Sequence, residues 1–254
     1  MSRIELSGGF INHVYREDGT VEKVYDHDEM VGVSSIRRLR NEAKALKFFG
    51  GGLAPKLIEI GPGFIIQEFI NGETYEVRAR RGENIFFEVG QILRQIHKPV
   101  RFREEVLKTY YERRINKVLS ATCEMLDFVC LVPRISLCWQ EVFSLGATCL
   151  HRDYWLGNIV GNEGKPKVID WEFAGVGSPY EDFAIVDLWI IREFKNSQLF
   201  WQGYGLDPDR DTLNAFLGLK CLEFLATTSV SSYKLESDDG FYHNKVNILK
   251  NIWK

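Results

Sequence analysis

The sequence lacks the features of several protein classes. Its five cysteines are scattered and include no Cys-x-x-Cys pair, so we expect reduced thiols in a cytoplasmic protein rather than a disulfide scaffold or a zinc site. No apolar run reaches the roughly 18 residues that a membrane span needs. The N-terminus has no charged leader followed by an apolar stretch, so no signal peptide is predicted.

The chain also lacks an excess of positive charge. Its 254 residues have a formal net charge of -3, and 45% of them are hydrophobic, which is typical of an ordinary globular protein. Nucleic-acid-binding domains are usually basic, so we expect no nucleic-acid partner and no membrane partner. The short cluster Arg78, Arg80 and Arg81 is interpreted as a solvated surface. The sequence leaves the oligomeric state open.

Strand signals dominate the first 70 residues. Short runs of β-forming residues alternate with turns, and Asp18-Gly19 between two of these runs is a strong hairpin signal. Five strands are expected, at residues 4–6, 12–16, 21–25, 56–60 and 64–69.

One helix is expected among these strands, at residues 35–49. Ser35 can cap its start, and the three glycines at 50–52 stop it. A spacing close to 3.6 residues predicts one apolar face, formed by Ile36, Leu39, Ala43 and Leu46. The predicted order is therefore three strands, a helix and two strands.

Asn71-Gly72 breaks this pattern and is the expected hinge, because the rest of the chain reads as mostly helical. Helices are predicted at residues 83–97, 103–131, 182–193, 211–228 and 242–253, and short strands at 158–160 and 166–169. We therefore predict an α+β fold with two lobes. Residues 1–70 form a small lobe with an antiparallel sheet and one helix, and residues 71–254 form a larger, mainly helical lobe.

The segment His151-Arg152-Asp153, followed after four residues by Asn158, has the residue types of a phosphotransfer loop. A carboxylate such as Asp153 can accept or orient the proton of an attacking hydroxyl. The amide oxygen of Asn158 can hold a magnesium ion. We interpret Asp153 as the catalytic residue and His151 as a structural histidine bonded to the backbone.

A second carboxylate supports this interpretation. Asp170 follows a strand-like run seventeen residues after Asp153, and a turn separates that run from the one that begins at Asn158. A hairpin would bring these groups together, and carboxylate and amide oxygens suit magnesium. Asn158 and Asp170 are therefore the predicted metal ligands.

A lysine is predicted to point inward in the N-terminal part. Strand alternation puts Lys23 on the same face as Val21 and Tyr25. A buried lysine needs an anionic partner, and Glu42, beside the apolar face of the helix, can supply it. Lys23 bonded to Glu42 and to nucleotide phosphates is the arrangement expected of a kinase.

These residues together resemble those of the aminoglycoside phosphotransferase and choline kinase superfamily, which is distantly related to protein kinases. The resemblance covers nearly the whole chain in order. It implies a bilobal protein-kinase-like fold, ATP and Mg²⁺ as cofactors, and transfer of the γ-phosphate to a hydroxyl of a small-molecule acceptor. Choline, ethanolamine, thiamine, a sugar and an aminoglycoside all remain open as the acceptor.

The resemblance also implies roles for individual residues. The segment 169–172, Ile-Asp-Trp-Glu, is similar to the family's metal-binding strand end. The implied nucleotide-binding residues are Gly8, Gly9 and Asn12 in the phosphate-covering turn, Lys23 and Glu42 in the ion pair, and Glu68 and Ile70 in the linker that holds adenine.

The acceptor site is less well defined by the sequence. Aromatic side chains in the helical part are expected to pack in the core, but some could form a box for an amine through cation–π contacts. Nearby carboxylates would add charge to such a box. The candidates are Trp155, Glu172 and Asp239.

Some features depart from the family pattern and keep alternatives open. There is no Gly-x-Gly-x-x-Gly. Arg152 stands where the family usually has glycine, and protein kinases have arginine at this position. However, Asp-Phe-Gly and Ala-Pro-Glu are absent, and only eleven residues separate Asp170 from Asp182, too few for a peptide-docking activation segment. The alternatives are a compact atypical protein or RNA kinase and a nucleotide-binding pseudokinase scaffold.

Overall fold

The computed structural model describes residues 3–6, 12–25, 33–121, 138–161, 164–230, 247–248 and 251. Contacts divide the chain into two compact units, of which the first consists of Met1–Ile96, His151–Gly175 and Phe194–Gly205. The second consists of His97–Leu150, Val176–Glu193 and Leu206–Lys254. Both units are discontinuous in the sequence, and the division into lobes at residue 70 stays a prediction.

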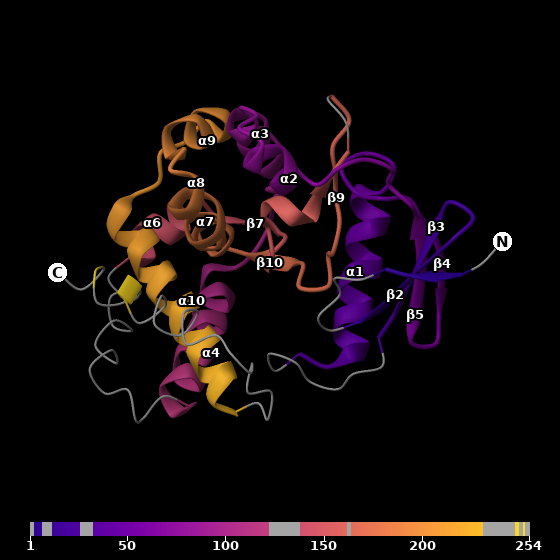
Figure 1. The fold of residues 1–254 in the computed structure, drawn as a ribbon. Coiled ribbons are helices and arrows are strands. Elements are labelled where there is room, and N and C mark those ends of the chain that lie inside the picture. The colour runs from indigo at the N-terminus through magenta and orange to yellow at the C-terminus, as the bar shows by residue number, and fades with distance from the viewer. Residues whose placement is uncertain are drawn as a thin grey trace. The chain divides into compact units, whose positions relative to one another are not determined.

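The first unit contains a five-stranded antiparallel sheet (Figure 1). Its strands are β1 (Ile4–Glu5), β2 (His13–Glu17), β3 (Thr20–Val24), β4 (Leu57–Gly61) and β5 (Phe64–Glu68), in the spatial order β1-β2-β3-β5-β4. The helix α1 (Ser35–Phe49) follows β3. The predicted order of three strands, a helix and two strands is confirmed.

The turn between β2 and β3 forms where Asp18-Gly19 predicted it. Glu17 and Thr20 are the last paired residues on either side, which leaves a two-residue loop. Both loop residues have positive φ, 45° for Asp18 and 80° for Gly19. This backbone matches the twist of the flanking strands and fixes the register that turns Val21, Lys23 and Tyr25 inward.

The inner face of α1 differs from the predicted one. Ile36 is 63% exposed, so its prediction as part of the buried stripe is wrong. The side chains of α1 that are buried belong to Arg38, Glu42, Ala43, Ala45 and Leu46. A pattern based on apolar residues alone misplaced the buried face. Two of the five buried residues of α1, Arg38 and Glu42, are charged and have buried partners.

The remaining elements of the first unit are mostly short. They are the helices α2 (Tyr75–Arg80), α3 (Phe86–Ile96) and α9 (Ser197–Tyr204), the 3-10 turn η2 (Leu156–Asn158), and the strands β8 (Ile159–Val160) and β9 (Lys167–Val168). The two strands form the predicted hairpin, in which Ile159 pairs with Val168. α2 and α9 were not predicted, because each is too short for a periodic pattern to be distinct.

The second unit is mainly helical. Its helices are α4 (Glu104–Ala121), α6 (Trp139–Ser144), α7 (Tyr180–Val186), α8 (Arg192–Phe194) and α10 (Arg210–Val230), with the π-helical turn η3 (Asp187–Ile191) between α7 and α8. Three short strands, β6 (Pro99–Val100), β7 (Ala147–Leu150) and β10 (Gly175–Gly177), pair in the order β10-β7-β6. The sheet of the first unit and the helices of the second confirm the predicted α+β class.

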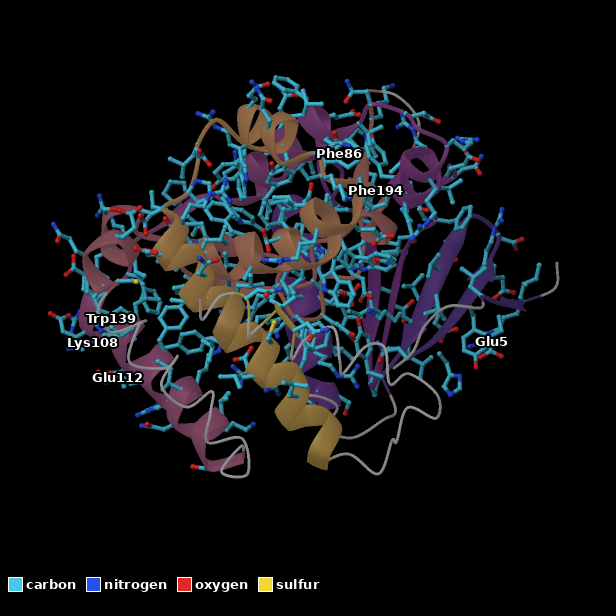
Figure 2. All side chains as sticks on the ribbon, turned by 60° about the vertical axis from the view of Figure 1, so that its left-hand side comes forward. Glu5, Phe86, Lys108, Glu112, Trp139 and Phe194 are labelled. Carbon is cyan, nitrogen blue, oxygen red and sulfur yellow. The ribbon has the colours of Figure 1, made fainter. Side chains whose placement is uncertain are left out.

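Ion pairs connect three of these helices. Arg114 of α4 lies 2.5 Å from Glu181 of α7 and 2.7 Å from Glu223 of α10. Elsewhere on α4, Lys108 and Glu112 lie one turn apart with their charged atoms 4.0 Å from each other (Figure 2). Among the described helices, none has the length and apolar character that crossing a membrane requires.

The predicted helices of the C-terminal part have mixed outcomes. Those at 83–97 and 211–228 correspond to α3 and α10, and the one at 182–193 begins earlier, at Tyr180. The helix predicted at 103–131 corresponds to α4 as far as Ala121, and residues 122–137 lie outside the described part. The helix predicted at 242–253 falls almost wholly outside the described residues.

Glycines allow α3 and α9 to approach each other closely. A Cβ added at Gly203 of α9 would overlap the backbone carbonyl of Phe87, and one added at Gly90 of α3 would overlap the carbonyl of Phe200. Phe86 at the start of α3 also contacts Phe194, with ring centroids 5.6 Å apart (Figure 2). The two helices therefore pack backbone to backbone at this point.

Replacing Gly203 by Ala should lower the free energy of unfolding by about 2 kcal/mol, because overpacking against backbone cannot be relieved by a rotamer change. Urea denaturation measures this change. Gly52→Ala is the matched control, since its Cβ would meet only the Phe49 carbonyl oxygen at 3.4 Å. Equal unfolding free energies for the two variants would contradict the close packing of α3 and α9.

Candidate active site

Three segments of the first unit meet at the ammonium group of Lys23. Lys23, near the end of β3, is 6% exposed. Its Nζ donates to Glu42 Oε2 of α1 at 2.8 Å and to Asp170 Oδ1, just after β9, at 2.5 Å. The inward lysine and its helix partner are thus brought together as the sequence predicted, and Asp170 joins them.

The charges in this cluster shift one another's pKa values. Burial alone would lower the pKa of Lys23, but the carboxylates of Asp170 and Glu42 outweigh it and raise that pKa well above the usual value. Burial would raise the pKa of Asp170, but the ammonium of Lys23 lowers it instead. Burial dominates at Glu42, whose pKa is raised. At neutral pH the Lys23–Asp170 pair is therefore fully ionised.

The loop after β7 is held by its histidine. The His151 Nε2 atom lies 3.0 Å from the Ile169 carbonyl oxygen, and the Asp153 backbone N–H donates to His151 Nδ1 at 3.3 Å. A neutral ring with its proton on Nε2 satisfies both bonds. His151 is thus a structural histidine bonded to the backbone, as the sequence indicated. Arg152 between them takes a left-handed backbone with φ of 64°.

Asn158 connects this loop to the hairpin β8–β9. Its side-chain Nδ2 donates to the carboxylate Oδ2 and to the carbonyl oxygen of Asp153, both at 2.9 Å. Its backbone oxygen accepts from the Ile169 N–H at 2.9 Å, which places Asn158 opposite the residue before Asp170. The two predicted metal ligands are thus brought to the same end of one hairpin.

The oxygens at this end fit a hard divalent ion. The Oδ1 atom of Asn158 accepts no hydrogen bond from any residue that the structure describes. The Asp170 side chain is 36% exposed, and Lys23 bonds to only one of its two oxygens. Magnesium prefers carboxylate and amide oxygens of this kind. Ligand atoms of Glu42, Asp170 and Glu172 also lie within 4.8 Å of one another, but the ammonium of Lys23 already bonds to two of these carboxylates.

Glu172 lies in a buried network that the sequence did not predict. Its Oε2 accepts from Asn12 Nδ2 at 2.7 Å and from Arg38 at 3.0 Å, and Arg38 also donates to Asn12 Oδ1 at 2.8 Å. Asn41 of α1 donates to the Glu172 backbone carbonyl at 3.1 Å. Arg38 precedes Glu42 by four residues, so helical spacing is the signal that could have indicated it.

The other predicted residues lie as follows. Trp155 is partly buried, and its ring lies so close to Gly157 that a Cβ there would overlap it. The Glu68 carboxylate accepts from the Lys56 N–H at 3.1 Å, and Ile70 follows β5 by two residues. Gly8, Gly9 and Asp239 lie outside the described residues.

The packing under the site uses Trp171, which is fully buried. Its indole N–H donates to the Val168 carbonyl at 2.7 Å, and its ring lies 4.9 Å from Phe49 and 4.6 Å from His151 between centroids. One side chain thus packs against the end of α1 and against the loop that carries Asp153.

Comparisons with known proteins give the family of the chain. A family model described as the phosphotransferase enzyme family matches residues 3–216. Among curated proteins, none matches the sequence.

Several solved structures share the fold. A choline/ethanolamine kinase family protein from Mesorhizobium loti has a TM-score of 0.72 at 16% identity, covering 100% of this chain and 88% of that one. Choline kinase LicA from Streptococcus pneumoniae has a TM-score of 0.66 at 18% identity, covering 99% and 94%. Spectinomycin phosphotransferase APH(9)-Ia, solved with ADP and spectinomycin, has a TM-score of 0.60 at 16% identity, covering 99% and 92%.

Replacing Lys23 by Met should lower the free energy of unfolding by about 3 kcal/mol near neutral pH, because buried carboxylates lose their ammonium partner. The loss should shrink on going from about pH 7.5 to about pH 5.5. Without Lys23 the folded-state pKa of Glu42 rises further above its unfolded value, so the folded variant gains stability as the pH falls. Urea denaturation at the two pH values measures this.

Lys44→Met is the control for this experiment, because Lys44 is an exposed lysine of α1, the helix that carries Glu42. Its unfolding free energy should differ from that of the wild type by less than about 0.5 kcal/mol at either pH. A Lys23→Met loss that is equal at both pH values would contradict the buried carboxylate cluster.

Proposed function

As a member of the phosphotransferase enzyme family, this chain is a kinase that transfers phosphate to small-molecule hydroxyls, and we propose that ATP is its donor and magnesium its metal ion. The observation that carries the proposal is the position of Lys23 between Glu42 and Asp170. A kinase needs a lysine fixed by a helix carboxylate and placed beside a metal-binding carboxylate.

We assign nucleotide binding to three segments. Lys23, held by Glu42, would bind phosphate oxygens, together with Asn12 and the backbone of Gly8 and Gly9. The backbone at 68–70 would hold adenine. Support comes from the Phe69 N–H, which donates to the Gly19 carbonyl at 2.9 Å and fixes this backbone. The Glu68 carboxylate is engaged with Lys56, so the backbone of Glu68 rather than its side chain is assigned to adenine.

We assign the magnesium ion to Asn158 and Asp170. Bound there, the ion would supply charge neutralisation for phosphate oxygens, which is the main electrostatic requirement of phosphoryl transfer. The chain's own contribution is to hold two hard oxygens at the end of the hairpin β8–β9 and to keep the Asp170 carboxylate ionised through Lys23.

Asp153 is the proposed catalytic residue. Its carboxylate would accept a hydrogen bond from the acceptor hydroxyl, orient the oxygen for in-line attack on the γ-phosphorus, and receive the proton as the new O–P bond forms and the bond to ADP breaks. Asn158 would hold this carboxylate in place through the bond at 2.9 Å. Positioning and electrostatic stabilisation would supply most of the rate acceleration.

For the acceptor we propose a hydroxylated amine of the choline or ethanolamine type, with thiamine, a sugar and an aminoglycoside as the other members of the test panel. Trp155 is partly exposed two residues after Asp153 and offers an aromatic face to a cation. Glu172 is left out of this assignment because it is only 2% exposed and its carboxylate is bonded to Arg38 and Asn12. We further propose a cytoplasmic location, where ATP is available.

The test is ADP release from ATP and magnesium in the presence of each acceptor of the panel. Release that depends on choline or ethanolamine would support the proposal for the acceptor, and release with another member would redirect it. If no member accelerates ADP release although ATP binds, the small-molecule proposal fails and a macromolecular substrate or a pseudokinase role gains support.

Replacing Asp153 by Asn should reduce turnover by about 100-fold to 10,000-fold, because the amide cannot accept the proton of the acceptor. Binding of ATP with magnesium should change by less than about threefold, since Asp153 does not contact the nucleotide in this mechanism. Steady-state kinetics and calorimetric titration measure the two effects.

Asp207→Asn is the control, because Asp207 is a carboxylate that is 75% exposed and lies in the other compact unit. It should retain wild-type turnover. Retained turnover in Asp153→Asn would remove Asp153 from the mechanism.

A further inference from the structure

The side chain of Arg38 is completely buried although it carries a full charge. A buried cation is costly unless a buried anion compensates it, and Arg38 pairs with Glu172 at 3.0 Å. This pair joins α1 to the segment that follows Asp170. Arg38 and Glu42 lie one helical turn apart, so a single face of α1 contacts both carboxylates of that segment, one directly and one through Lys23.

The donors around Glu172 are arranged in a closed triangle. Arg38 donates to Asn12 and to Glu172, and Asn12 donates to the same Glu172 oxygen. All three residues are at most 8% exposed. Asn12 and Arg38 therefore both bond to Glu172 Oε2, the oxygen that lies nearest to Lys23.

Lys23 lies near enough to Glu172 to compete with Arg38 for its carboxylate. Its Nζ is 3.6 Å from Glu172 Oε2, compared with 2.5 Å from Asp170 and 2.8 Å from Glu42. Three carboxylates and two cations, Lys23 and Arg38, make up the cluster, which gives a net charge of -1 when all are ionised. Removal of the guanidinium charge would leave -2 around the single ammonium.

We propose that Arg38 is a positioning residue that neutralises Glu172 and so keeps Lys23 available for nucleotide phosphates. This inference rests on the proposed ATP-dependent function and deepens it. Without the guanidinium, Glu172 would attract the ammonium of Lys23, and the added negative charge would repel the polyphosphate. The same uncompensated carboxylate would strengthen the attraction of the site for a divalent cation.

Three substitutions separate charge from geometry. Arg38→Gln removes the positive charge but keeps a hydrogen-bonding side chain. Arg38→Lys keeps the charge but loses the forked donor geometry. The double variant Arg38→Gln with Glu172→Gln removes one charge of each sign and restores the net charge of the cluster. Arg37→Met is the control, because Arg37 is the exposed neighbour on the same helix.

Two binding measurements need no turnover. ADP titrated without metal reports on the lysine, and Mn²⁺ titrated without nucleotide, followed by electron paramagnetic resonance, reports on the carboxylates. For Arg38→Gln we expect ADP affinity to fall at least about tenfold and Mn²⁺ affinity to rise, a pair of opposite changes that simple loss of packing cannot produce. Arg38→Lys and the double variant should stay within about threefold of the wild type in both titrations.

Some outcomes would overturn the inference. If Arg38→Gln weakens ADP and Mn²⁺ binding together, or if the double variant binds ADP as weakly as Arg38→Gln, Arg38 is only a packing residue. If Arg38→Gln does not fold, the double variant and Arg38→Lys decide, since weak ADP binding by both would exclude a role of charge balance.

The outcome for the proposed function is read separately. A wild-type protein that binds ADP and Mn²⁺ but phosphorylates no acceptor contradicts the proposed function, while the comparison among the variants still tests Arg38. If the wild-type protein binds neither ADP nor Mn²⁺, both proposals fail, and no acceptor of the panel should be phosphorylated. Opposite changes in Arg38→Gln with normal phosphorylation by the wild type would support both.

Discussion

The arrangement of the site depends on the bonds of the Lys23 ammonium group to the carboxylates of Glu42 and Asp170. A buried lysine must be surrounded by anions, and the fold meets this need with carboxylates from α1 and from the segment after β9. Each of these elements is therefore fixed by the same charge. The hairpin turn at Asp18-Gly19, through the register it sets, determines that this lysine faces inward rather than toward solvent.

The cluster carries more negative than positive charge, which is unfavourable for an isolated protein and suitable for one that binds a cation. Buried charges that shift one another's pKa values in this way are typical of functional sites. The packing of Trp171 against Phe49 and His151 provides the rigid apolar support that such a strained group of charges needs. Left-handed backbone at Arg152 and Asp170, each with φ of 64°, adds to the local strain.

Much of the fold could be predicted because its signals are local. The turn at residues 18–19, the end of α1 at Gly50 and the hairpin before Asp170 depend on nearby glycines and on alternation, whereas the start of α1 has no side-chain cap and the capping role predicted for Ser35 is wrong. Helical spacing could have placed Arg38 on the same face as Glu42, but its burial depends on partners 26 and 134 positions away in the sequence, which no local pattern shows. The pairing of Lys23 with Glu42 was predictable because chemistry left few partners for an inward lysine. The role of Glu172 was not, because a carboxylate near an active site fits many roles.

The bond between Asn158 and Asp153 has a consequence for how two ligands of the site would affect each other's binding. One end of the amide holds the carboxylate assigned to the acceptor, and the other end carries the oxygen assigned to the metal ion. Two ligands whose binding groups are joined by one side chain can be thermodynamically linked, and such a linkage is reciprocal. If binding of the metal ion changes the affinity for the acceptor, binding of the acceptor must change the affinity for the metal ion by the same factor. The two ligands would then favour or oppose each other through the position of a single amide side chain.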